Sequence, residues 1–215
     1  MIDLIKKNFS FISIYLVFAL AVVLLIGTKG KINAQLFANQ FHSSFFDFTF
    51  FWSTKIVEWF SFLVILGILL FKGAKFAING LLIYAITAVT TFSLKRLLFF
   101  HELRPTSVLN ELRLLPPEFG LSQLTSHSFP SGHTTAAFTL FCFITLISSN
   151  KKLGYIYGII AAFIAYSRVY LSQHFFQDIL AGATIGTIAT FVFYFVLNKI
   201  KYGEWALKPL VKLKK

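Results

Sequence analysis

The chain has 215 residues, of which 57% are hydrophobic and only 13% are charged, and it includes 28 phenylalanines. This composition excludes an ordinary soluble domain, in which about a quarter of the residues are charged. The formal net charge is +12, but the basic residues are scattered over short loops and a tail, which excludes a nucleic-acid-binding face.

Long runs without Asp, Glu, Lys or Arg recur along the sequence, and several reach or approach the roughly 20 residues that are needed to cross a bilayer. We therefore expect an all-α fold, a six-transmembrane-helix bundle that forms one integral membrane domain over residues 1–215. A signal peptide is less consistent with the first run, because the run is long and no A-x-A-like cleavage site follows it. The expected spans are residues 8–28, 53–71, 76–95, 132–149, 153–168 and 177–198.

The distribution of charge over this six-span pattern predicts the orientation of the chain. One side would hold a net charge of +10 and the other a net charge of +2. By the positive-inside rule, both termini are then cytoplasmic. The Lys-rich tail, residues 199–215, would lie along anionic headgroups on that side.

An aromatic pattern follows the first span. Residues at steps of three or four form one helical stripe, which suits a helix lying in the outer membrane interface over residues 35–52. A loop packed on the bundle explains the pattern equally well. The stripe consists of Phe37, Phe41, Phe45, Phe48 and Trp52.

The stretch between the last two spans, residues 167–178, places three ionisable side chains between apolar runs, where a charge is costly without a partner or water. If the chain is helical from Gln173 onward, His174 and Asp178 are i, i+4 neighbours. The carboxylate then holds one imidazole nitrogen and leaves the other as a lone pair. Arg168 stands six residues before His174, so a bend must bring its guanidinium to the same place, where its donors suit a phosphoryl group.

The fourth span opens with Pro130-Ser131-Gly132-His133. Such a helix start presents free backbone N–H groups that bind anions, and glycine allows a phosphate oxygen to approach closely. An N-cap with an incidental histidine is the simpler alternative. Residues 130–133 would lie on the same outer side as residues 167–178, and this position favours the anion-binding interpretation.

The third span ends in Lys95-Arg96 and is followed by Arg104-Pro105. Pro105 stops any helix. Considered alone, these cations are typical of side chains that snorkel at a membrane boundary. In the six-span pattern, however, they reach the outer side together with His133 and His174.

These segments resemble the signatures of the type 2 phosphatidic acid phosphatase and haloperoxidase superfamily. Ser167-Arg168, five residues, His174, three residues and Asp178 match the third signature, and Pro130-Ser131-Gly132-His133 matches the second. Their order and separation resemble those of the family's membrane-bound lipid phosphatases. The resemblance covers most of the chain from the third span to the sixth.

The first signature departs from the family pattern. In the family a lysine stands seven positions before the Arg-Pro pair, whereas Lys95 stands nine before Arg104 and Leu97 occupies the expected place. Nine residues at 3.6 per turn end on roughly the opposite helix face. Lys95 can join Arg104 only if the helix unwinds after about Phe100, or Arg96 must substitute for it.

The resemblance implies a metal-independent lipid phosphatase. His174 would attack phosphorus to give a phosphohistidine, Asp178 would hold its tautomer, and His133 would protonate the leaving oxygen and later assist a water molecule. The substrate would be a phosphate monoester or diphosphate of a lipid, such as phosphatidic acid, phosphatidylglycerophosphate, undecaprenyl diphosphate or lipid A. The expected phosphate-binding groups are Lys95, Arg104, Arg168 and the amides around Ser131 and Gly132.

Two other functions remain open at this stage: a lipid phosphotransferase that uses the same histidine, and a non-catalytic binder or transporter of anionic lipids. No cofactor is expected. His127, His133, His174 and Asp178 could ligate a metal, but no HExxH or CxxC spacing is present, and the nearby arginines would repel a cation. Compact size and short loops favour a bacterial cytoplasmic membrane, with the site on its outer face.

Two remaining features are structural. Gly182 and Gly186 form a GxxxG pattern on the face that continues from Asp178, which predicts that another helix approaches closely beneath the site. Cys142 is the only cysteine, so no intrachain disulfide can form. The sequence gives no indication of an oligomeric state.

Overall fold

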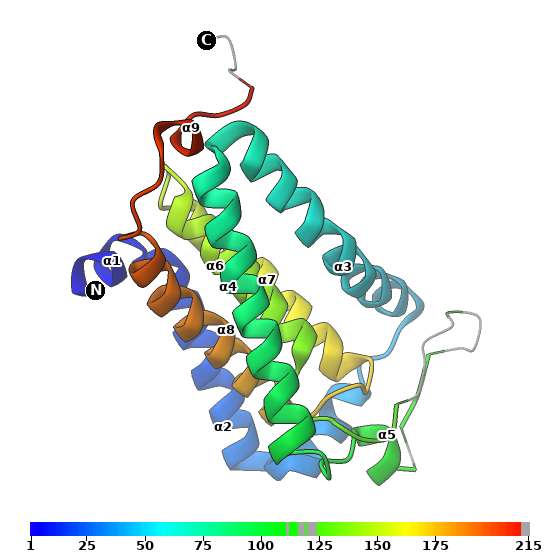
Figure 1. The fold of residues 1–215 in the computed structure, drawn as a ribbon. Coiled ribbons are helices and arrows are strands. Elements are labelled where there is room, and N and C mark those ends of the chain that lie inside the picture. Colours follow the sequence, from blue (N-terminus) through cyan, green and yellow to red (C-terminus); the bar gives the residue numbers. More distant parts are fainter. Residues whose placement is uncertain (111, 116–118, 120–123, 212–215) are drawn as a thin grey trace.

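The computed structural model describes residues 1–110, 112–115, 119 and 124–211, and the side chains of residues 56–60 and 62 are outside this description. All regular structure within these ranges is helical, which confirms the all-α prediction. The elements, shown in Figure 1, are α1 (Ile2–Lys7), α2 (Phe9–Asn39), α3 (Ser44–Lys72), α4 (Ala74–Ser93), the π-helical turn η1 (Leu94–Leu98), α5 (Pro105–Val108), α6 (Gly132–Ile147), α7 (Leu153–Tyr170), α8 (Phe176–Leu197) and α9 (Glu204–Leu207).

Four of these segments are long and apolar enough to cross a membrane, namely Phe9–Asn39, Ala74–Leu98, Leu153–Tyr170 and Phe176–Leu197. Leu63–Lys72 and Gly132–Ile147 are shorter apolar helices. The 16 residues of α6 extend about 24 Å at 1.5 Å per residue. The chain is therefore an integral membrane protein with four candidate spans and two further apolar helices.

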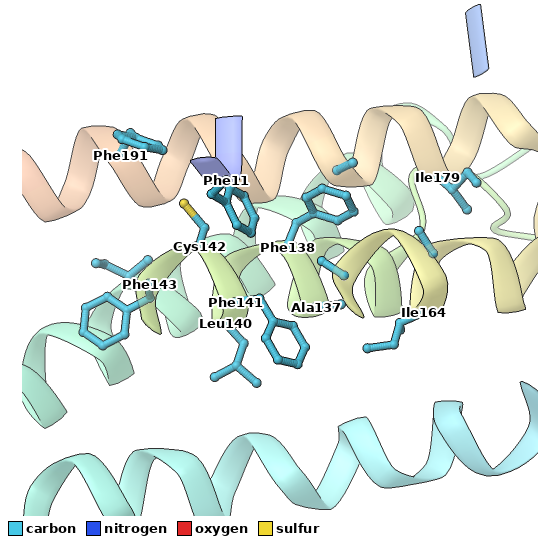
Figure 2. Packing of buried hydrophobic residues seen from close by; sticks show 14 of the residues in the cluster. Phe11, Ala137, Phe138, Leu140, Phe141, Cys142, Phe143, Ile164, Ile179 and Phe191 are labelled. Carbon is cyan, nitrogen blue, oxygen red and sulfur yellow. The ribbon is translucent and has the colours of Figure 1, made fainter. Parts of the chain in front are cut away.

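Helix α6 is the central element of the bundle, packed against α4, α7 and α8. Figure 2 shows why it is buried on most of its surface: Phe138 and Cys142 point toward α8, whereas Leu140 and Phe141 point to the opposite side. The Phe138 ring meets the Phe11 ring edge-on, with centroids 6.1 Å apart. A helix that is apolar all round belongs in such a position.

The loops divide between two ends of the bundle. Helices α1 and α9 and the α3–α4 and α6–α7 turns lie at one end, and α5 and the α7–α8 loop lie at the other (Figure 1). Lys151 caps α6 by donating from Nζ to the carbonyls of Thr145 and Leu146. Burial lowers the pKa of Lys151, and the charges of Lys7 and Lys72 lower it further. Three basic segments therefore meet at the first end.

Helix α8 approaches α6 as closely as the GxxxG pattern predicts. A Cβ at Gly182 would lie 2.6 Å from the carbonyl oxygen of Ser131, and one at Gly186 would lie 2.7 Å from that of Thr135. The Ser131 amide also donates to the Asp178 carbonyl at 3.0 Å. These contacts fix the start of α6 against the start of α8.

Residues 35–52 do not form a single helix. Helix α2 is broken by a kink at Gly30, whose φ of 75° and ψ of 168° are not helical, and its second part runs to Asn39 before α3 begins at Ser44. Ser43 caps α3 by accepting a hydrogen bond from the Phe46 amide. The five aromatic side chains of the expected stripe are all exposed, but Phe37 lies in α2, Phe41 in the turn that follows it, and the other three in α3. Their membrane placement stays a prediction.

Candidate active site

A cavity of about 420 Å³ opens at the α5 end of the bundle. It brings together the three segments that the sequence places on one side. The expected site residues that line it are Lys95, Arg104, Gly132, His133, Arg168 and His174. Asp178 and Ser131 are buried beside it.

His174 lies in the loop before α8, and its imidazole is buried. Its Nδ1 is 3.4 Å from Oδ2 of Asp178, slightly longer than an ordinary hydrogen bond. Nε2 is therefore the nitrogen directed away from the carboxylate. Because α8 begins only at Phe176, a loop and not a continuous helix places the two side chains together.

Ser128 is a site residue that the sequence reasoning did not single out. Its Oγ donates to Oδ2 of Asp178 at 2.5 Å and lies 3.5 Å from Nδ1 of His174. The Phe175 amide donates to the same Oδ2 at 2.9 Å. Asp178 is thereby fixed from two sides, and Oδ1 has no hydrogen-bond partner within the described part of the chain. The nearness of Ser128 to Pro130 was the only sequence indication.

Arg104 is held by main-chain oxygens rather than by a carboxylate. Its Nε donates to the Ser126 carbonyl at 3.0 Å, and Nη1 donates to the Gln173 carbonyl at 2.8 Å. The second bond joins the loop after the third span to the residue directly before His174. Arg104 thus sits beside the imidazole in a fixed orientation.

The predicted bend between Arg168 and His174 is a tight turn after α7. The amides of Gln173 and His174 both donate to the Arg168 carbonyl, at 2.9 and 3.2 Å. Ser172 adopts a left-handed conformation with φ of 54°. The Arg168 guanidinium turns toward α3 and donates from Nη1 to Oγ1 of Thr54 at 3.0 Å.

The π-helical turn η1 resolves the irregular spacing of the first signature. The chain leaves α-helical geometry after Ser93, earlier than Phe100, and ends its helical course at Leu98. A π turn changes the face that each following residue occupies, and Lys95 consequently lines the cavity with Arg104. Arg96 points elsewhere, with Nη1 3.4 Å from Nε2 of His127.

Ser131 corrects one expectation. Its amide is used by the Asp178 carbonyl, and its Oγ accepts from the amide and hydroxyl of Thr134. Ser131 caps α6 and joins it to α8. The next two residues of this helix start, Gly132 and His133, line the cavity.

The electrostatics of the cavity favour a neutral histidine surrounded by cations. Burial lowers the pKa of His174 well below its usual value, and the positive charges of Arg104, Lys95 and Arg168 add to this effect. Burial also lowers the pKa of Arg104, opposed by the charge of Asp178. His174 therefore presents a lone pair at neutral pH, and the cavity is attractive to an anion.

The part of the chain that the structure describes has no cluster of side chains that could bind a metal ion. No three side chains of the His, Cys, Asp and Glu types are grouped there so that they could hold an ion. His127, one of the four candidate ligands, is not among the residues lining the main cavity.

A family model described as the PAP2 superfamily matches residues 76–202, which include all three signature segments. The chain belongs to the PAP2 superfamily. The family resemblance inferred from the signatures is thereby confirmed.

Several characterised PAP2 proteins and their relatives are similar to this chain. It is 29% identical over 175 residues to a lipid A 4'-phosphatase of Bacteroides thetaiotaomicron, covering 77% of this chain and 76% of that protein. It is 37% identical over 95 residues to phosphatidylglycerophosphatase B of Bacillus subtilis, and 36% over 92 residues to an undecaprenyl-diphosphatase of Sulfolobus acidocaldarius. These two matches cover 40% and 42% of this chain, and 47% and 41% of those proteins.

Two solved structures share the fold. LpxE of Aquifex aeolicus superposes with a TM-score of 0.67 at 24% identity, covering 76% of this chain and 93% of that one. A PAP2-type phosphatidylglycerolphosphate phosphatase of Bacillus subtilis superposes with a TM-score of 0.65 at 23% identity, covering 91% and 98%. The bundle described above is therefore a PAP2 fold.

Proposed function

We propose that this chain removes phosphate from a membrane lipid through a phosphohistidine formed at His174. Membership of the PAP2 superfamily, together with the named relatives, makes the chain a membrane-bound, metal-independent lipid phosphatase. One observation carries the histidine assignment. Asp178 and Ser128 lie against Nδ1 of His174, while the same imidazole lines a cavity with His133 and four basic residues, Lys55, Lys95, Arg104 and Arg168.

In the first half-reaction, Nε2 of His174 attacks phosphorus and the bond from phosphorus to the lipid oxygen breaks. His133 donates a proton to that oxygen, and the lipid alcohol leaves. In the second half, a water molecule attacks phosphorus while His133 accepts a water proton. The P–N bond breaks, and inorganic phosphate and neutral His174 are released.

The cations stabilise the charge that develops on the nonbridging phosphate oxygens. Arg104 and Arg168 are fixed by main-chain and hydroxyl acceptors, so they require little reorganisation. Lys95 adds a third charge. The N–H groups of Gly132 and His133, at the start of α6, would donate to the phosphate.

For the membrane arrangement, we propose one domain with six spans, both termini in the cytoplasm and the cavity at the outer face. The convergence of Lys7, Lys72 and Lys151 at the opposite end supports this orientation. A bacterial cytoplasmic membrane fits the bacterial relatives. The substrate's acyl or prenyl chain would remain in the bilayer while its headgroup enters the cavity.

The substrate class is a lipid phosphate monoester or diphosphate. The named relatives act on lipid A, phosphatidylglycerophosphate and undecaprenyl diphosphate, and phosphatidic acid fits the same cavity chemistry. A lipid phosphotransferase would share the phosphohistidine and differ only in its acceptor. Product analysis with a lipid alcohol present separates the two, because a transferase yields a new lipid phosphate instead of inorganic phosphate.

His174→Ala tests the nucleophile. We expect phosphate release from lipid substrates to fall by at least about 1,000-fold, since the covalent step is lost. The protein should still insert and retain its thermal transition. His101→Ala is the matched control, because His101 is exposed, contacts the Phe100 ring at a tilt and does not line the cavity. Near-normal phosphate release by His174→Ala would reject the assignment.

A further inference from the structure

A second cavity of about 290 Å³ adjoins the first. Lys95 and Arg104 line both cavities, so these two cations stand between them. Arg96 and His127 line only the second cavity, and the chemistry proposed above uses neither. The remaining lining residues are Leu124, Thr125 and Ser126.

The loop that carries His127 is fixed along its length. Arg104 and Ser107 both donate to the Thr125 carbonyl, at 3.0 and 2.8 Å. Arg104 reaches the Ser126 carbonyl through Nε, and the Ser128 amide donates to the Glu102 carbonyl at 2.9 Å. The second cavity therefore has a defined wall.

His127 holds Arg96 over this cavity. Its backbone is left-handed, with φ of 57°, a conformation that is uncommon outside glycine and is enriched at functional sites. Its Nδ1 lies 2.8 Å from Oγ of Ser126, and Nε2 lies 3.4 Å from Nη1 of Arg96. Arg96 has five N–H donors, and this contact uses one of them.

The charge of the second cavity is strongly positive. Burial and the charges of Arg96, Lys95 and Arg104 all lower the pKa of His127, which reflects the proximity of these groups. Among the described residues that line this cavity, none carries a carboxylate. The nearby Glu102 is directed to Lys31, with 3.6 Å between the charged atoms. The lining therefore suits a further anionic group on the substrate.

We propose that this cavity binds a second phosphoryl group of the lipid substrate, contacted by Arg96, with His127 as the positioning residue. The inference rests on the proposed function and narrows its substrate class. In a lipid diphosphate, His174 would attack the terminal phosphorus, and the bond to the bridging oxygen would break. The lipid monophosphate would leave with its charge held by Arg96, Lys95 and Arg104. A second phosphate at another position of a glycolipid headgroup would bind in this cavity through the same charged contacts.

Two variants test the subsite. Arg96→Gln removes the charge, and His127→Asn removes the imidazole while keeping a residue that tolerates left-handed backbone. Lys29→Gln is the matched control, because Lys29 is another exposed cation that lies over an aromatic ring but lines neither cavity. The substrate pairs are a prenyl diphosphate with its monophosphate, and a bisphosphorylated glycolipid with its monophosphorylated form.

We expect Arg96→Gln to lower kcat/KM about tenfold for the doubly phosphorylated member of one pair, which is the effect of losing a charged hydrogen bond. For the monophosphorylated member of that pair, kcat/KM should stay within about twofold of the wild-type value. His127→Asn should lower kcat/KM for the doubly phosphorylated member by a smaller factor. If kcat/KM falls selectively only in the prenyl pair, the cavity binds the second phosphoryl group of a diphosphate. If it falls selectively only in the glycolipid pair, the cavity binds a separate phosphate of the headgroup. Equal losses on both members of each pair, or no loss, would overturn the proposal.

Binding of inorganic pyrophosphate and phosphate to the full-length protein in detergent gives a measurement independent of turnover. The wild type should bind pyrophosphate about tenfold more tightly than phosphate, and Arg96→Gln should remove that difference. If the protein hydrolyses no lipid, the proposed function is wrong, but this titration still shows whether the second cavity binds a second phosphoryl group. Equal affinity of the wild type for the two anions would refute it.

Discussion

His174 combines three properties that a nucleophile needs: burial, contacts that orient its ring, and a position on the wall of the cavity. Asp178 and Ser128 contact one edge of the ring, and the surrounding cations oppose its protonation. The contact with Asp178 is long at 3.4 Å, which is common before a substrate binds. A small rotation of the ring would then shorten it.

The protonation state of His174 can be measured directly. Because burial and Arg104 lower the pKa of His174, the ring should be neutral at pH 6.5, where an ordinary histidine is about half protonated. ¹⁵N NMR of histidine-labelled protein in detergent would follow all five histidines. Comparison with His174→Ala assigns the signal. A ring that titrates at or above pH 6.5 would contradict the expected direction.

Single-residue roles were only partly predictable. The His174–Asp178 pairing was expected from i, i+4 spacing on a helix that begins at Gln173, whereas α8 begins at Phe176 and the loop before it brings the two side chains together. The contributions of Ser128 and Gln173 do not follow from spacing, because each depends on a loop that crosses from another segment. Ser131 was assigned to phosphate, but its amide is consumed by a backbone contact that no local pattern reveals.

At the scale of secondary-structure elements, the two decisive features are the π turn of η1 and the close packing of α8 on α6. Counting at 3.6 residues per turn placed Lys95 and Arg104 on opposite faces, and a local change of helical pitch invalidates that count. Because sequence periodicity assumes a uniform pitch, it predicted only that Lys95 could reach the site if the helix unwinds before Arg104. Small residues, in contrast, predicted the α6–α8 contact correctly.

Gly182→Ala tests how tightly α8 must approach α6. The new Cβ would lie 2.6 Å from the Ser131 carbonyl oxygen, so the helices must separate, at a cost of about 1–3 kcal/mol. We expect a lower thermal midpoint in detergent and reduced activity, since Ser131 and Asp178 would move apart. Gly67→Ala is the control, as nothing lies within 4 Å of a Cβ there. Equal midpoints for the two variants would argue against close packing at this point.

At the scale of the whole molecule, composition was sufficient to predict an all-helical membrane protein. Helix boundaries were less predictable, because uncharged runs report where a chain is apolar and not where it is helical. Helix α2, for example, kinks at Gly30, close to the end of the uncharged run at Thr28, and then resumes to Asn39. The charge counts predicted that both termini are cytoplasmic, and this prediction has to be tested in a membrane.

Cysteine accessibility in intact cells would decide the orientation. Cys142 is fully buried, so Cys142→Ala gives a silent background for single cysteines at two exposed positions. Asn110 follows α5 and Lys152 precedes α7 in the α6–α7 turn, and these two elements lie at opposite ends of the bundle (Figure 1). A membrane-impermeant maleimide should label position 110 at once and position 152 only after permeabilisation. The reverse order would invert the topology and place the cavity in the cytoplasm.

The hydrogen bonds of residues 124–128 have a wider consequence. This strip is attached to residues 102–107, and its last residue, Ser128, also donates to Asp178 beside His174. The wall of the second cavity and the nucleophile are thus joined through Ser128. Exchange of residues 124–127 alone between superfamily members, with Ser128 retained, should change headgroup preference and preserve hydrolysis, a route by which one bundle could diversify its lipids.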